Sequence, residues 1–240
     1  FKSVGKVLEE IEYLTKNFGI KEITFYDESF TANRMFVREL CSRIIEEKID
    51  ISWMCSARVD MVDPETLKLM KKAGCHQIAF GIESADETIL KNINKKISLE
   101  KAVNAVKMTQ EAGIEARANF MFGSPGETEE TIKKTLDFAL KLEPDYALFN
   151  ITTPLPGTAM FEWAKENKLL KTTDWKDYDF SKHVMNLPTI SSEKVMEHYR
   201  MAHKKFYLRP RYIIKRILKI RSMQDIKNNF DSFFMLSRGD

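Results

Sequence analysis

The chain has 240 residues, of which 43% are hydrophobic and 30% are charged, and its formal net charge is +3. This composition is typical of a globular protein that folds in water, and the length suffices for one large domain with a full core. No apolar run approaches the roughly 20 residues of a membrane-spanning helix, and no signal peptide is recognisable. We therefore expect a cytoplasmic protein rather than an integral membrane or secreted one.

The three cysteines, Cys41, Cys55 and Cys75, lie far apart in the sequence. Their spacing is that of neither a disulfide framework nor a metal site. We expect all three to be buried free thiols in a reducing compartment.

Short apolar runs alternate along the chain with segments in which apolar residues recur at helical spacing. The expected strands are residues 22–26, 51–56, 77–81, 114–122 and 146–152. The expected helices are residues 4–18, 35–45, 64–73, 99–112, 127–142 and 158–167. Two helix starts carry specific signals, because Asp63 precedes Pro64 and Ser98 stands before an apolar helical pattern.

Alternation of strands and helices is typical of right-handed crossovers and a parallel sheet. The predicted fold class is therefore α/β, a partial TIM-like (β/α)6 barrel over residues 1–167, followed by a loop-rich connection and helical C-terminal extension over residues 168–240. A helix opens the chain with no strand before it. We expect the first strand of the barrel to lie upstream of Phe1, which makes the chain a piece of a longer protein.

Polar residues or a glycine-rich turn follow every predicted strand at its carboxyl end. They are Asp27 and Glu28, Arg58 and Asp60, Glu83 and Ser84, the turn at Gly123, and Thr152 and Thr153. In a parallel barrel these ends meet at one mouth, where ligands bind. A carboxylate suits ribose hydroxyls or an ammonium group, an arginine suits a carboxylate, and a glycine lets a flat ring approach backbone amides. This mouth is predicted to bind a ligand with an amino acid moiety and a nucleoside.

Two of these strand ends have alternative interpretations. Ser84, with Asp86 after it, would also favour the first turn of a following helix. The turn at residues 123–128 resembles a phosphate loop, but it lacks the lysine of a P-loop, and Glu127 and the acids after it would repel a phosphate. We interpret it as a tight turn that packs on a ligand ring, with its acids at a helix start.

Five segments in order, residues 53–60, 73–75, 81–84, 122–128 and 154–158, carry a family likeness. They resemble the successive core motifs of the radical S-adenosylmethionine (SAM) superfamily, and most of all the class that often carries an N-terminal cobalamin-binding domain. The resemblance covers about residues 1–165. It implies a [4Fe–4S] cluster that reductively cleaves SAM to a 5′-deoxyadenosyl radical, an electron donor such as flavodoxin or ferredoxin, and methyl transfer, cyclisation or rearrangement of a small-molecule or lipid-like substrate.

The same resemblance assigns cofactor contacts within this chain. Glu83 and Ser84 would contact the ribose or amino group of SAM, and Gly123 and the Pro154–Gly157 turn would lie near its adenine. Arg58 is the candidate for the SAM carboxylate. No catalytic residue and no metal ligand is identified.

The family's three cluster cysteines, spaced Cys-x3-Cys-x2-Cys, are absent, and the dispersed cysteines of this chain cannot replace them. We expect the cluster loop upstream of Phe1, so that this chain alone would not turn over. One alternative is a non-catalytic SAM-like binding module that has lost the cluster. Another is an ordinary aldolase-type barrel enzyme, which would need a strand-end lysine, whereas lysines such as Lys95 and Lys96 are expected on helices and loops.

Basic residues interleave with apolar ones over residues 209–221. This pattern is typical of a solvated basic helix, and the alternative is peripheral contact with an anionic membrane; nucleic acid is not expected. The histidines are expected to be solvated or to cap helices rather than to bind metal. They are His76, His183, His198 and His203.

Overall fold

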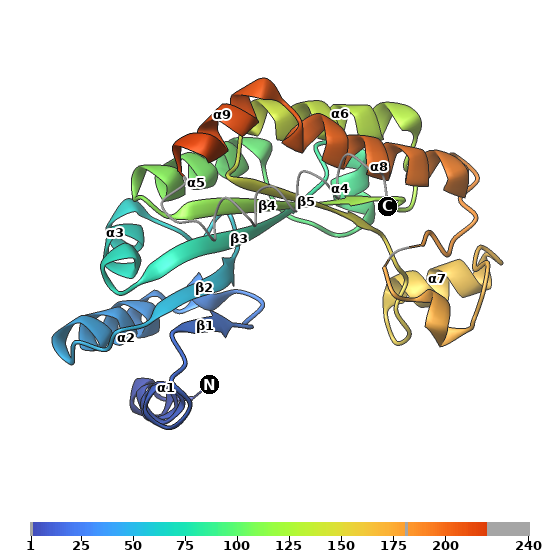
Figure 1. Ribbon diagram of the computed structural model, residues 1–240. Coiled ribbons are helices and arrows are strands. Elements are labelled where there is room, and N and C mark those ends of the chain that lie inside the picture. Colours follow the sequence, from blue (N-terminus) through green and yellow to red (C-terminus); the bar gives the residue numbers. More distant parts are fainter. Residues whose placement is uncertain (1, 181, 220–240) are drawn as a thin grey trace. The chain divides into compact units, whose positions relative to one another are not determined.

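The structure is a computed structural model, and it describes residues 2–180 and 182–219 (Figure 1). Its strands are β1 (Glu22–Phe25), β2 (Ser52–Ala57), β3 (Cys75–Glu83), β4 (Glu115–Phe122) and β5 (Tyr146–Ile151). Its helices are α1 (Val4–Phe18), α2 (Arg34–Glu46), α3 (Pro64–Lys72), α4 (Glu87–Asn92), α5 (Leu99–Glu111), α6 (Glu129–Leu142), α7 (Ala159–Glu166), α8 (Ser192–Tyr207) and α9 (Pro210–Leu218), with short 3-10 turns η1 (Phe30–Ala32) and η2 (Trp175–Asp177).

The strands form one sheet in the order β1-β2-β3-β4-β5. The pairs β1–β2 and β2–β3 are parallel, with Glu22 opposite Ser52 and Ala57 opposite Phe80. The predicted α/β class with a TIM-like arrangement is confirmed. Within the described residues the sheet stays open and does not close into a barrel.

Local chemistry explains where the helices begin. The Asp63 carboxylate accepts a hydrogen bond from the Thr66 amide at 3.0 Å, with Pro64 in the first turn of α3. The Ser98 hydroxyl accepts from the Lys101 amide at 3.2 Å at the start of α5. Both predicted caps are confirmed, and each satisfies an amide that the helix itself leaves without a partner.

By packing, the chain divides into two compact units. Of the described residues, the first unit comprises 2–82, 97–119 and 142–146, and the second comprises 83–96, 120–141, 147–180 and 182–219. No helix among the described residues combines the length and the apolar character that crossing a bilayer requires.

In the first unit, Trp53 is fully buried and its indole N–H donates to the Ala73 carbonyl at 2.7 Å. The three cysteines are free and buried, as predicted. Burial raises the pKa of Cys41 to about 12 and that of Cys75 well above its ordinary value. Cys41 and Cys75 are therefore unreactive core groups.

In the second unit, α8 packs against β5 and α6 (Figure 1). The Tyr207 hydroxyl donates to the Ala147 carbonyl at 2.7 Å and accepts from the Ala147 amide at 3.2 Å. About two and a half turns before Tyr207 on α8, His198 Nε2 lies 3.2 Å from a Glu129 carboxylate oxygen. The helix α8 thus packs on the core of this unit.

That packing corrects the expectation for two histidines. His183 and His198 are buried, so neither is solvated, and neither caps a helix. The reason is that α8 buries one face within the second unit, and His198 lies on that face together with Val195, Ala202 and Phe206. Among the described residues of the segment 168–190, the ordered elements are η2 and isolated β-bridges.

Candidate functional site

The end of β3 carries a charged pair. The Glu83 carboxylate accepts from Lys95 Nζ at 3.0 Å, and the two side chains are 17% and 27% exposed. Glu83 has a φ of 69°, a left-handed conformation that is rare outside glycine and is concentrated at functional sites. Lys95 lies in the loop after α4, as predicted. Because α4 is short, this loop returns the chain to the end of β3, and the lysine amine reaches Glu83, a contact that the sequence does not indicate.

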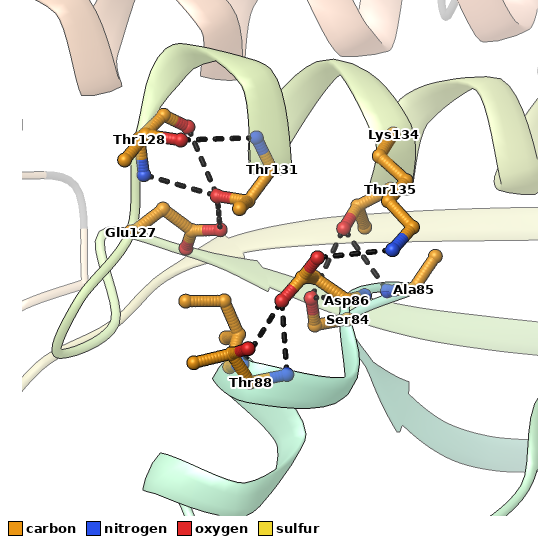
Figure 2. A network of polar contacts seen from close by, with 10 residues as sticks. Ser84, Ala85, Asp86, Thr88, Glu127, Thr128, Thr131, Lys134 and Thr135 are labelled. Atoms are coloured by element: carbon orange, nitrogen blue, oxygen red, sulfur yellow. Dashed lines mark hydrogen bonds and ion pairs between the residues drawn. The ribbon is translucent and has the colours of Figure 1, made fainter.

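Ser84 is fully buried beside α6. Its Oγ lies 3.1 Å from Thr135 Oγ1 and accepts from the Asp86 amide at 3.1 Å. Figure 2 shows Thr135 also accepting from the Ala85 amide, at 3.0 Å. The Ser84 hydroxyl thus fastens the β3–α4 turn to α6, and its contact with a cofactor stays a prediction.

The helix-start interpretation of this segment is confirmed, with Asp86 as the capping residue. Its carboxylate accepts from the amides of Thr88 at 2.9 Å and Ile89 at 3.3 Å, and it pairs with Lys134 at 3.0 Å (Figure 2). Asp86 is held by these partners, which lower its pKa although burial opposes them.

Glu127 anchors the turn after β4. The amides of Gly123 and Ser124 donate to its Oε2 at 3.0 and 3.2 Å, and the Thr131 hydroxyl donates to its Oε1 at 3.0 Å (Figure 2). The carboxyl is fully buried, and burial raises its pKa from 4.5 to about 7 against the opposing effect of these hydrogen bonds.

This geometry corrects the interpretation of Glu127 as an acid in the first turn of a helix. The helix α6 begins at Glu129, and Thr128 Oγ1 accepts from the Thr131 amide as its cap, while Glu127 folds back into the core. Two amides of the turn are therefore already engaged. A ligand ring could pack against the surface of this turn, but it could not accept hydrogen bonds from the N–H groups of Gly123 and Ser124.

The end of β5 is tied to the same turn. The Thr152 amide donates to the Phe122 carbonyl at 2.8 Å, and Thr152 Oγ1 lies 2.9 Å from Ser124 Oγ. Beyond it, Pro154 is buried, and Gly157 is exposed with a φ of 80°. The structure thus brings together the turn at Gly123 and the carboxyl end of β5.

Arg58 belongs to the first unit, whereas the other predicted cofactor residues belong to the second. Its Nε and Nη2 both donate to the Asp60 carboxylate at 3.0 Å. This bidentate pair raises the pKa of Arg58 and lowers that of Asp60. Binding of another carboxylate by Arg58 would therefore compete with Asp60 or use Nη1.

The described residues do not fit an iron–sulfur cluster. No group of three or more histidine, cysteine, aspartate or glutamate side chains that could hold a metal occurs among them. Cys41, Cys55 and Cys75 are buried on α2, β2 and β3, not on one loop. By contrast, the Glu83–Lys95 pair offers opposite charges that fit the amino acid moiety of SAM.

Residues 1–139 match the family model of the radical SAM superfamily. The chain belongs to the radical SAM superfamily. Membership implies SAM and a [4Fe–4S] cluster as cofactors and radical chemistry as the reaction class, and it sets aside the aldolase-type alternative. The predicted family is confirmed.

Two curated relatives extend this finding. An uncharacterized methyltransferase of Pyrococcus horikoshii is 42% identical over 217 residues, covering 90% of this chain and 47% of the relative. The anaerobic magnesium-protoporphyrin IX monomethyl ester cyclase of Cereibacter sphaeroides is 29% identical over 208 residues, covering 85% of this chain and 34% of the relative. The chain thus spans half or less of the length of these relatives.

Two solved structures share the fold. The radical SAM methyltransferase TsrM from Kitasatospora setae, with cobalamin and a [4Fe–4S] cluster bound, has a TM-score of 0.63 at 21% identity over 72% of this chain and 35% of its own. The cobalamin-dependent radical SAM enzyme OxsB, with aqua-cobalamin and SAM bound, has a TM-score of 0.64 at 17% identity over 99% of this chain and 41% of its own.

Proposed function

We propose that the chain is the SAM-binding part of a cobalamin-dependent radical SAM methyltransferase. Residues 1–167 would form its barrel core and residues 168–240 an extension to it. The observation that carries the proposal is the 42% identity, over 90% of the chain, to a relative named as a methyltransferase. The fold shared with two cobalamin-binding radical SAM enzymes supports it. The cluster cysteines would precede Phe1 in a longer protein, in keeping with the relatives' greater length.

The charged pair at the end of β3 is the proposed anchor for the methionine moiety of SAM. Glu83 would bind the ammonium or a ribose hydroxyl, and Lys95 would bind the carboxylate. Both side chains are partly exposed, so a ligand can replace their mutual contact. Ser84 would act by holding the start of α4, and Arg58 stays a candidate for the carboxylate.

The adenosine end would lie against the turns that follow β4 and β5, at Gly123 and at Pro154–Gly157. On β4 itself, Arg117 and Asn119 lie on the half-buried face of the strand. Arg117 Nε and Asn119 Oδ1 are buried and lack a hydrogen-bond partner among the described residues. Both residues belong to the first unit, and buried polar atoms without partners are costly there.

The test is anaerobic reconstitution of the complete gene product, followed by reduction in the presence of SAM. We expect 5′-deoxyadenosine in the wild type. The yield in Glu83→Gln should be at least about tenfold lower, which corresponds to the loss of one charge-assisted hydrogen bond. S-adenosylhomocysteine formed with substrate would distinguish methyl transfer from cyclisation. Lys16→Gln, which removes an exposed surface cation paired within α1, is the matched control.

The second candidate is a SAM-binding module without a cluster. The described residues favour it in one respect, since they hold no set of cluster ligands. Binding of SAM with no 5′-deoxyadenosine, together with an upstream sequence that lacks the cysteine loop, would establish it in place of the methyltransferase.

Radical SAM enzymes act on small-molecule substrates and use electron donors, and we propose a flavodoxin or ferredoxin as the donor here. We also propose that α9 contacts an anionic membrane and serves a lipid-like substrate. In support, Ile214 and Leu218 of this basic helix are 58% and 81% exposed. Flotation with anionic vesicles at low and high salt tests this, and absence of salt-dependent binding would refute it.

A further inference from the structure

Two buried side chains contact the backbone of Gly123, one at its N–H group and the other at its carbonyl oxygen. Glu127 accepts the N–H groups of Gly123 and Ser124. On the carbonyl side, His183 Nε2 lies 3.3 Å from Gly123 O. Glu127 follows the turn directly in sequence, whereas His183 comes from the connection before α8.

The hydrogen-bond partners assign the protonation of His183. Because the Gly123 carbonyl can only accept, Nε2 carries the proton. On the other side of the ring, Nδ1 can then only accept. The Ser192 hydroxyl, at the first residue of α8, lies 3.1 Å from Nδ1 and 3.1 Å from the Met185 carbonyl, so with this tautomer it donates to Nδ1 in place of Met185. Burial lowers the pKa of His183, which favours this neutral form. The ring is thus oriented by Ser192 and directed at the turn.

The turn and the ring are also fitted to each other in shape. Gly123 has a φ of 84°, and a Cβ placed there would lie 2.6 Å from His183 Nε2 and 3.2 Å from Val195 Cγ1. Any larger residue would therefore push against both the connection and α8. The far side of the turn is fixed as well, since Asn92 Nδ2 donates to the Pro125 carbonyl at 2.8 Å.

We infer that His183 is a positioning residue for the SAM-binding turn. Through the Gly123 carbonyl it fixes the peptide against which the adenosine end of SAM would pack. His183 and Ser192 lie beyond residues 1–139, the part that matches the family model. The connection and α8 are therefore part of the cofactor site. The inference rests on the proposed function, which places Gly123 at the adenosine.

Two substitutions separate this role from general packing. In His183→Gln the side-chain amide nitrogen takes the place of Nε2 and keeps the bond to Gly123. In His183→Asn the amide reaches only as far as Nδ1, so the bond to Gly123 is lost. Both remove the ring, and we expect both to lower the melting temperature. His76→Asn is the control, because His76 is a partly exposed histidine paired with Glu22.

The measurement is the dissociation constant of SAM for the complete, anaerobically reconstituted gene product, by equilibrium dialysis. We expect about a tenfold increase for His183→Asn, the effect of losing one buried hydrogen bond. The increase should stay within about twofold for His183→Gln and for His76→Asn. Ser192→Ala, which frees the ring without deleting it, should give an intermediate increase.

Equal affinities in the wild type and His183→Asn would overturn the inference. So would equal losses in His183→Asn and His183→Gln, because that pattern would indicate packing alone. A wild type that fails to bind SAM would refute the proposed function itself and, with it, this inference. The two failures are distinguished by the wild-type measurement.

Discussion

Replacing Glu127 with glutamine should change how the stability of the protein depends on pH. The glutamine oxygen can accept from the Gly123 and Ser124 amides as Oε2 does now. Its NH2 group can donate to Thr131 Oγ1, since the Thr131 hydroxyl lies 3.0 Å from the Thr128 carbonyl and can donate there instead. The substitution therefore preserves the hydrogen-bond pattern and removes a buried titratable charge.

The size of this change in unfolding free energy follows from the linkage between proton binding and folding. The pKa of Glu127 rises from 4.5 to about 7 on folding. A carboxyl with a raised folded pKa stabilises the protein fully below its unfolded pKa, and this stabilisation is lost as pH rises through the folded value. Between pH 5 and pH 8 the loss amounts to between about 2 and 3 kcal/mol. Glu127→Gln has no such loss.

The assay is urea unfolding of the apo wild type and of Glu127→Gln at pH 5, 6, 7 and 8, followed by circular dichroism. The buried His183 and the half-buried His203 also titrate, and burial lowers the pKa of each, which favours folding at higher pH. Both histidines occur in both proteins, so their contribution cancels in the difference. We expect the variant to gain between about 2 and 3 kcal/mol relative to the wild type from pH 5 to pH 8. Parallel stability curves would refute the reasoning.

Two further predictions concern the first unit and the charged pair. Gly74→Ala should destabilise the protein by more than about 2 kcal/mol, because Gly74 has a φ of 95° and an added Cβ would lie 2.1 Å from the Ile51 carbonyl oxygen. Gly19→Ala is the control. Gly19 has a φ of 64° but open space around an added Cβ, so this substitution should cost about 1 kcal/mol. Equal urea midpoints would contradict this. Lys95→Met should weaken SAM binding about tenfold. The melting temperature should stay within a few degrees of the wild-type value, since the ion pair of Lys95 with Glu83 is partly exposed. An unchanged dissociation constant of SAM would show that Lys95 does not bind the cofactor.

Much of the fold was predictable because its signals are local. Asp63 and Ser98 cap helices through contacts three residues away, and alternating spacing indicated the strands. The site was less predictable because its contacts span the chain. Lys95 reaches Glu83 only through the return of α4, and His183 reaches Gly123 across 60 residues. Glu127 was misread because an acid near a helix start looks the same in sequence whether it is solvated or folded into the core.

The contact between Tyr207 and Ala147 has a consequence for self-association. β5 is the last strand in the sheet order, so its outer edge could accept a strand from another molecule. A single phenol occupies both the amide and the carbonyl of Ala147, which in a parallel strand point to the same side. Through Tyr207, α8 therefore makes these two groups of β5 unavailable to an incoming strand, which disfavours edge-to-edge pairing at this point of the strand.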